Sequence, residues 1–168
     1  MQISKLAIGT AQFGLDYGIK KEGEVNLKEI RKILEFAKKN KINTLDTAYA
    51  YKNAEIKLGI IGVNEWNIIS KIPSIPKKIV DEKKWIYSVF LTSLKNLRVS
   101  KINTILIHDS STILNKINGD RIYQTLDELK KNKLVKNIGC SIYCPSELNK
   151  LIKRYNFDIV QAPFNIFD

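Results

Sequence analysis

Apolar residues follow two alternating patterns along this chain. Short runs rich in β-branched residues have the length of buried strands, and the segments between them place apolar residues every three or four positions, as helices do. Each strand and helix together take roughly thirty residues, which is typical of parallel βα units. The patterns predict strands over residues 5–9, 42–45, 66–71, 103–107, 135–141 and 159–162.

The predicted helices lie between these strands. The first follows Asn26, a favourable N-cap residue, and its apolar positions reach Ala37. A short helix beginning at residue 53 or 54 is expected to end before Gly59, and residues 10–23 are expected to form a loop because glycines interrupt them. Longer helices are predicted over residues 77–97, 121–132 and 145–155.

This order of elements predicts a (β/α) barrel. No Gly-x-Gly-x-x-Gly phosphate loop occurs in the chain, so an open dinucleotide-binding sheet is less favoured. A closed eight-stranded barrel takes about 250 residues and seldom fewer than 200, whereas this chain has 168. We therefore expect one domain over residues 1–168, an α/β fold of (β/α)8 TIM-barrel type with about six of the eight βα units.

The formal net charge of +11 comes almost entirely from lysine. The lysines are spread along the chain, and no basic stripe interleaved with aromatic residues appears, as a nucleic-acid surface would need. Lys, Ile and Asn are abundant while Arg is scarce, which is the bias expected of an AT-rich genome. We interpret the charge as solvated surface and expect no nucleic-acid partner.

Two further features bear on the cellular compartment. No apolar run approaches the roughly 18 to 20 residues that a membrane-spanning helix needs, and the first residues do not resemble a signal peptide. Cys140 and Cys144, together with a single histidine, are too few for a metal site or a disulfide framework. We expect a cytoplasmic chain with reduced thiols, no membrane partner and no metal.

Four predicted strands end in a residue that ionises or carries a hydroxyl group: Asp46, Lys71, His108 and Ser141. Each alone has an ordinary structural explanation, such as a turn cap for the aspartate or a packed, hydrogen-bonded histidine. In a parallel β/α fold, however, the carboxyl ends of the strands face one pocket. A lysine flanked by isoleucines would be costly there without an anionic partner such as Asp46. The pattern therefore predicts an active site at the strand ends.

The motifs along the chain resemble those of the aldo-keto reductase family. The resemblance covers nearly the whole sequence, and no motif is displaced from its expected order. It implies reduction of a small aldehyde or ketone to an alcohol, with NADPH as cofactor and without a metal. The matching residues are Gly9-Thr10-Ala11-Gln12-Phe13-Gly14, Asp46-Thr47-Ala48, Tyr51, Glu55, Leu58-Gly59, Lys71, Leu106-Ile107-His108 and Gly139-Cys140-Ser141.

The resemblance implies a role for each catalytic residue. Tyr51 would be the general acid, Lys71 and Asp46 the pair that tunes it, and His108 the residue that orients the carbonyl group. A free tyrosine has a pKa of about 10, and a neighbouring ammonium group would lower that pKa toward a useful range. His108 would then direct a hydrogen bond to the oxygen on which negative charge develops.

By the same resemblance, four residues would contact the nicotinamide end of the cofactor. Thr10 and Asp46 would lie near its ribose, and Ser141 and Gln161 near its carboxamide. Each of the last two also has a structural explanation, as a strand-end cap and as a hydrogen-bonded buried amide. The loops expected around this pocket carry aromatic residues, which ordinary loop packing explains equally well: Phe13, Tyr17, Tyr49 and Tyr143.

The chain departs from the family pattern in two places. Ile142 follows Ser141 where the family often has asparagine, which removes one amide contact to the nicotinamide. The family also continues with two more strands, a loop over the pyrophosphate and basic residues that bind the adenosine phosphate, which this sequence does not contain. We therefore expect a C-terminally truncated member whose first and last strands have unpaired edges.

Three hypotheses about function follow. The first is an active aldo-keto reductase that reduces a small-molecule carbonyl compound with Tyr51 as general acid. The second is a catalytically inactive, truncated remnant. The third is a partial barrel completed by a second chain or a second copy, through self-association at the unpaired edges. The residues do not identify the carbonyl substrate, and NADPH rather than NADH is an expectation from the family alone.

Overall fold

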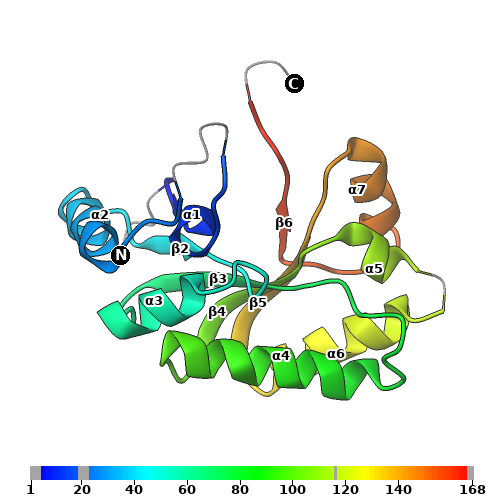
Figure 1. The fold of residues 1–168 in the computed structure, drawn as a ribbon. Helices are drawn as coiled ribbons and strands as arrows, with labels where there is room; N and C mark the ends of the chain where they lie inside the picture. Colours follow the sequence, from blue (N-terminus) through cyan, green and yellow to red (C-terminus); the bar gives the residue numbers. More distant parts are fainter. Residues whose placement is uncertain (1–4, 19–22, 116, 166–168) are drawn as a thin grey trace.

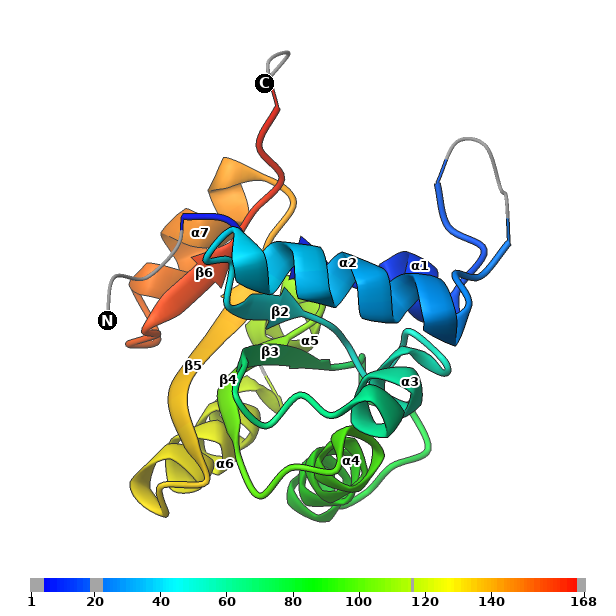
Figure 2. The ribbon, with the colours of Figure 1, turned by 90° about the vertical axis from the view of Figure 1, so that its left-hand side faces the viewer.

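Six parallel strands form one curled sheet in the computed structural model, which describes residues 5–18, 23–115 and 117–165. The strands follow the order β1-β2-β3-β4-β5-β6, and every neighbouring pair is parallel. The prediction of an incomplete (β/α)8 barrel is confirmed, and Figure 2 shows how the sheet curls from β2 round to β6. The strands are β1 (Ile8–Gly9), β2 (Thr44–Asp46), β3 (Asn67–Ile72), β4 (Ile102–Ile107), β5 (Val135–Ser141) and β6 (Ile159–Gln161).

The longer helices cover the convex side of this sheet. Figure 1 shows α4 and α6 side by side beneath β3 to β5, with α3 beside α4 and α2 near β2. Each helix therefore follows a strand and packs outside the barrel, as the βα order requires. The helices are α1 (Ala11–Gly14), α2 (Leu27–Lys39), α3 (Ala54–Ile61), α4 (Glu82–Leu97), α5 (Ser110–Leu114), α6 (Gly119–Lys131) and α7 (Pro145–Ile152).

The hydrophobic core lies between the convex face of the sheet and these helices. Phe90 on α4 and Leu126 on α6 are completely buried there, and so is Ile105 on β4. Burying a side chain of this size stabilises the fold by about 1.5–3 kcal/mol. The helices therefore hold β3, β4 and β5 rigidly, which matters for the residues at the ends of these strands.

Strand alternation decides which side chains face the concave side of the sheet. Ser70 on β3 faces outward, because its Oγ donates a hydrogen bond to Glu55 on α3. Lys71, the next residue, therefore faces the concave side. Lys71 is in register with Leu106, and Ser141 is in register with Gln161. The registers bring the polar strand ends to the same mouth of the barrel.

Helix α3 runs one turn further than its sequence predicted. We expected Gly59 to end it, but the helix continues to Ile61 and ends at Gly62, which has a left-handed φ of +91°. Gly59 serves close packing instead, because a Cβ at this position would lie 2.1 Å from the carbonyl oxygen of Asn96 on α4. The glycine therefore permits a helix contact and does not terminate the helix.

Helix α4 begins five residues later than predicted, at Glu82. The side chain of Asp81 caps it by accepting a hydrogen bond of 2.9 Å from the backbone N–H of Lys84. Ile79 instead lies in a turn in which its N–H donates to the carbonyl group of Pro76. Apolar periodicity extended the prediction across this turn because Ile79 has the spacing of a helical position.

Two short helices were not predicted. Helix α1 lies within residues 10–23, which we expected to be a loop, and α5 follows His108 directly. The side chain of Asp109 caps α5 by accepting a hydrogen bond of 2.9 Å from Ser111 N. Helices of four or five residues leave no periodic pattern to detect. Residues 19–22 of the expected loop lie outside the described residues.

Candidate active site

The mouth of the curled sheet contains a cavity of about 220 Å³. Strands β2 to β6 each contribute to it a residue within one position of the strand's end, as the sequence predicted from the polar strand ends. The four catalytic candidates come together here with three of the four expected cofactor contacts, and Asp46 belongs to both sets. The lining residues are Asp46, Tyr51, Lys71, His108, Ser141, Ile142, Tyr143, Gln161, Ala162 and Pro163.

A buried ion pair lies at the bottom of this cavity. Lys71 Nζ is 2.5 Å from Asp46 Oδ1 and donates a second hydrogen bond, of 3.0 Å, to the carbonyl oxygen of Thr47. The Lys71 side chain is only 3% exposed. Burial lowers the pKa of Lys71, and the Asp46 carboxylate offsets part of that shift. The anionic partner that the sequence required for a buried lysine is therefore present.

Tyr51 and His108 contact each other beside this pair. The aromatic rings of Tyr51 and His108 meet edge to face, with centroids 5.8 Å apart, and Lys71 Nζ lies 5.4 Å from the centre of the Tyr51 ring. Burial and then the charge of Lys71 lower the pKa of His108. His108 is therefore a neutral imidazole near neutral pH and acts as a hydrogen-bonding group rather than a cation.

The pKa of Tyr51 moves in the opposite direction from our expectation. Burial of the phenol raises its pKa to about 12, and the Asp46 carboxylate adds to the shift. We expected the Lys71 ammonium group to lower this pKa, but Lys71 is already paired with Asp46, and the nearby negative charge acts against phenolate formation. In this state Tyr51 retains its proton throughout the physiological pH range.

A chain of side-chain hydrogen bonds crosses the mouth from β5 to β2. Ser141 Oγ donates to Gln161 Oε1 at 3.2 Å, and Gln161 Nε2 donates to Asp46 Oδ2 at 3.1 Å. Asp46 is thereby held by Lys71 through one oxygen and by Gln161 through the other. The three predicted cofactor contacts that line the cavity form one connected network.

Thr10 lies apart from this network. Its side chain is completely buried, its Oγ donates a hydrogen bond of 3.0 Å to the backbone carbonyl of Asp46, and it is not among the residues that line the cavity. Its N–H bonds to the same carbonyl at 2.9 Å. Thr10 therefore supports the end of β2 through the Asp46 carbonyl. Its expected position near the cofactor ribose stays a prediction.

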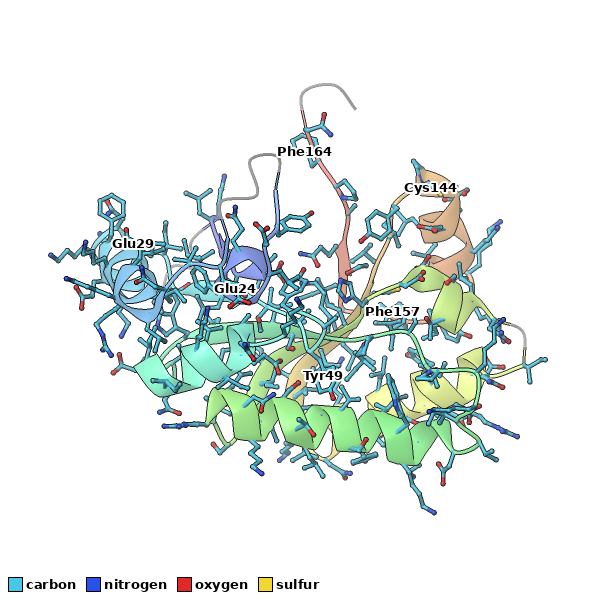
Figure 3. All side chains as sticks on the ribbon, in the orientation of Figure 1. Glu24, Glu29, Tyr49, Cys144, Phe157 and Phe164 are labelled. Carbon is cyan, nitrogen blue, oxygen red and sulfur yellow. The ribbon has the colours of Figure 1, made fainter. Side chains whose placement is uncertain are left out.

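The aromatic residues of the surrounding loops separate into two groups. Phe13 is buried on α1 and belongs to the core, whereas Tyr143 lines the cavity. Tyr17 and Tyr49 are exposed, and Figure 3 shows where Tyr49 lies relative to the sheet. Sequence reasoning missed Ala162 and Pro163 as lining residues, although they are the last residue of a predicted strand and the residue directly after it.

The described residues contain few alternatives to this site. Among them no group of three or more His, Cys, Asp or Glu residues could hold a metal ion. Cys140 and Cys144 are both free, and burial raises the pKa of the Cys140 thiol to about 12, which makes it unreactive near neutral pH. No helix in the described part of the chain is both long and apolar enough to cross a membrane.

The fold and the site together define a partial (β/α) barrel whose strand ends carry a phenol, an imidazole and an ammonium–carboxylate pair. The sequence profile of the aldo/keto reductase family matches residues 5–168. The chain belongs to this family, and the resemblance seen in its motifs is confirmed. A comparison with curated proteins gives no significant match.

Solved structures of aldo-keto reductases share the fold. A Pseudomonas aeruginosa protein assigned to this family is 26% identical, with a TM-score of 0.81, and the match covers 99% of this chain and 65% of that one. For the holo form of an aldo-keto reductase from Bacillus halodurans the identity is 21%, the TM-score 0.76, and the coverage 98% and 54%. An aldo/keto reductase from Klebsiella pneumoniae, solved with NADP and acetate, is 14% identical, with a TM-score of 0.70 and coverage of 92% and 50%. The chain thus spans between half and two thirds of these relatives' lengths.

Proposed function

We propose that this chain supplies the catalytic part of an oxidoreductase that reduces an aldehyde or ketone to an alcohol with NADPH. The observation that carries the proposal is the buried Lys71–Asp46 pair, which lies beside the Tyr51 phenol and the His108 imidazole in one cavity. Family membership supports a nicotinamide cofactor, and the Klebsiella pneumoniae relative was solved with NADP.

Tyr51 would deliver the proton. With its pKa raised to about 12, the phenol keeps its proton until a stronger base appears beside it. An alkoxide developing on the carbonyl oxygen is such a base, so the proton moves from Tyr51 Oη to that oxygen as the alcohol forms. The free phenol would not lose its proton to water beforehand, because burial and the Asp46 charge both disfavour the phenolate.

Lys71 would stabilise the phenolate that this transfer leaves behind. Its ammonium group is held near the Tyr51 ring by the bond to Asp46 and by the Thr47 carbonyl, so little reorganisation is needed during the reaction. The neutral His108 would place a hydrogen bond on the substrate oxygen and select the orientation of the carbonyl group. Asp46 acts through Lys71, by keeping it charged and fixed.

The donors and acceptors at the mouth fit the nicotinamide end of the cofactor, which supplies hydride when bound. Ser141 Oγ and the Gln161 amide offer the donor and acceptor groups that a carboxamide requires, and Asp46 Oδ2 can accept from a ribose hydroxyl group. Gln161 would have to exchange its bond to Asp46 for these contacts. Among the described residues that line the cavity, Lys71 is the only lysine or arginine, and its pairing with Asp46 leaves no free cation there for the phosphates.

The outer edges of the sheet support self-association as a second proposal. Strand β1 pairs only with β2, and β6 pairs only with β5, so one edge of each has no strand partner among the described residues. An exposed edge is a template for pairing with another chain. We propose that copies of this chain associate through these edges, and sedimentation of the purified protein would reveal a strictly monomeric species if they do not.

Titration with NADPH and an activity assay test the proposed function. Calorimetry should show saturable NADPH binding, and the mass of the species in the same preparation shows whether a second copy contributes. Carbonyl-dependent NADPH oxidation should then fall by about 100- to 10,000-fold in Tyr51→Phe, because the proton donor is lost. If a folded chain neither binds NADPH nor oxidises it, the catalytically inactive alternative is correct.

A further inference from the structure

A buried carboxyl group lies behind the loop that carries Tyr51. Glu55, in the first turn of α3, is only 1% exposed. Its Oε1 accepts a hydrogen bond of 2.7 Å from Ser70 Oγ, and its Oε2 accepts one of 3.5 Å from Asn96 Nδ2. Within the described ranges, Glu55 forms no ion pair with Lys, Arg or His. Burying such a group costs free energy, which its neutral donors only partly offset.

The bonds of Glu55 join three elements at one point. Ser70 belongs to β3 and directly precedes Lys71, and Asn96 belongs to the last turn of α4. Gly59, one turn after Glu55 on the same face of α3, touches the backbone of Asn96 so closely that a Cβ there would lie 2.1 Å from its carbonyl oxygen. Glu55 thus fixes the start of α3 against both the sheet and α4.

The loop that carries Tyr51 ends at this point. Ala54 N donates to the Tyr51 carbonyl at 3.0 Å, and Tyr49 N donates to the Lys71 carbonyl at 3.3 Å. On the opposite side, a Cβ on Gly14 of α1 would lie 1.9 Å from the same Tyr51 carbonyl oxygen. The backbone of Tyr51 is therefore held between α1 and the start of α3, and a shift of α3 would move the phenol relative to Lys71.

We propose that Glu55 is a positioning residue for the active site: its carboxyl group holds the start of α3 against β3 and so sets the placement of Tyr51 beside Lys71. The effect of this role on catalysis rests on the proposed function, whereas its effect on the position of Tyr51 does not. Burial raises the pKa of Glu55, and hydrogen bonds from Ser70, Ser93 and Asn96 offset part of the rise. Glutamine keeps the acceptor for Ser70 without a charge, and should therefore preserve the position.

Hydrogen exchange of backbone amides tests the positioning without any assay of activity. In Glu55→Ala, the amides of Tyr49, Tyr51 and Ala54 should exchange about 10-fold faster or more, while those of β4 keep their protection. In Glu55→Gln they should stay close to the original rates. The matched control is Glu82→Ala, because Glu82 is also a buried first-turn glutamate, 6% exposed, but lies on α4 beside Arg121. It should leave the three loop amides unchanged.

Kinetics test the consequence for catalysis. Glu55→Ala should lower kcat for carbonyl reduction by about 10- to 100-fold at little change in the KM of the carbonyl substrate, because misplacing a reacting group mainly affects the chemical step. Glu55→Gln should recover most of the loss, and Glu82→Ala should keep the original kcat. If the unmodified chain itself shows no activity, the proposed function fails, and hydrogen exchange alone decides the role of Glu55.

Two results would overturn the inference. Uniformly faster exchange across α3, β3 and β4 in Glu55→Ala would show that the residue contributes only to global stability, and unchanged exchange at the three loop amides would show that it contributes nothing to their position. If Glu55→Ala does not fold, Ser70→Ala replaces it as the decisive variant, since it removes only the 2.7 Å bond. The same three amides must then exchange faster than those of β4, or the proposal is wrong.

Discussion

The middle of the sheet and its two outer strands differ in almost every physical respect. Strands β3, β4 and β5 have six, six and seven residues and pack against α4 and α6, whereas β1 has two residues and β6 has three. Lys71 and His108 belong to the middle, and Gln161 belongs to the edge. The difference teaches that Lys71 and His108, which assist the proposed proton transfer, are held by long strands backed by helices, whereas Gln161, a proposed nicotinamide contact, lies on a short edge strand.

The largest effect should come from the core beneath the middle strands. Phe90→Ala should cost about 3–5 kcal/mol of unfolding free energy, because Phe90 is completely buried on α4. Phe164→Ala should change it by less than about 0.5 kcal/mol, because Phe164 is 95% exposed. Figure 3 shows Phe164 on the segment that follows β6. Urea denaturation of both variants measures the contrast, and similar losses would mean that the edge is packed against something.

The next effect separates chemistry from stability within the middle region. Lys71→Met should lower the rate of carbonyl reduction by about 100-fold. The unfolding free energy should change less than removal of one partner of a fully buried pair would cause, because the remaining Asp46 carboxylate is 20% exposed and keeps its bond to Gln161. Lys57→Met is the matched control. Lys57 is on α3, its Nζ lies 2.8 Å from Glu24 Oε2, and it does not line the cavity. Steady-state kinetics and urea denaturation of both variants measure the change in rate and the change in unfolding free energy. An unchanged rate in Lys71→Met would contradict the assignment.

A smaller effect on stability concerns the contacts that join the edge strand β6 to β5 and α6. Asp158, just before β6, accepts from Ile138 N at 2.9 Å and pairs with Lys130 at 2.5 Å, so Asp158→Asn should cost about 1–3 kcal/mol at neutral pH. Burial alone would raise the pKa of Asp158, but these partners outweigh it and lower the pKa. The carboxylate therefore stabilises the fold above pH 3.8, the ordinary value, and this contribution is lost as the pH falls through the lower folded-state value.

Denaturation of Asp158→Asn and the unmodified chain at several pH values follows this dependence. The difference in unfolding free energy should shrink as the pH falls below the ordinary carboxyl pKa, since both proteins then carry an uncharged group at this position. A difference that stays constant down to the lowest pH at which the proteins fold would show that the charge is irrelevant.

The smallest effect lies at the edge itself. Gln161→Ala removes the bonds to Ser141 and Asp46 and should cost about 1 kcal/mol, visible as faster hydrogen exchange in β6 but not in β4. Gln124→Ala, an exposed glutamine on α6, provides the control and should leave both strands unchanged. Equal exchange in β6 with and without the Gln161 side chain would mean that the bridge across the mouth contributes nothing.

Much of the fold could be predicted because long elements repeat their pattern several times. The prediction for β5 matches the structure residue for residue, that for β4 differs by one residue at its start, and that for β3 is shifted by one residue at both ends. Short elements such as α1 and α5 carry too few repeats to show a period. The prediction at Gly59 was wrong because a glycine in a helical pattern has two explanations. It can end the helix through its backbone conformation, or it can allow a neighbouring backbone to come close because it has no side chain. Only the position of α4 shows that the second applies here.

The features of the site that follow from topology could be predicted, whereas those that follow from packing could not. The strand-end rule identified Asp46, Lys71, His108 and Ser141 as members of one cavity, since topology alone brings these positions together. It could not give the direction of the Tyr51 pKa shift, because that depends on which partner neutralises Lys71 and on how deeply the phenol is buried. The position of Thr10 behind Asp46 depends in the same way on packing that a linear sequence does not express.

The hydrogen bond between Asp46 and Gln161 joins residues 115 positions apart in the chain. During synthesis the first two βα units leave the ribosome long before Gln161 is made. The hydrogen bond between Gln161 and Asp46 therefore cannot form until β6 has been synthesised. Contacts between residues so distant in sequence are also slow to form, because a long loop must be ordered first. We therefore expect the site to be completed late in folding, and a nascent chain ending before β6 would carry Tyr51 and Lys71 without the bond between Gln161 and Asp46.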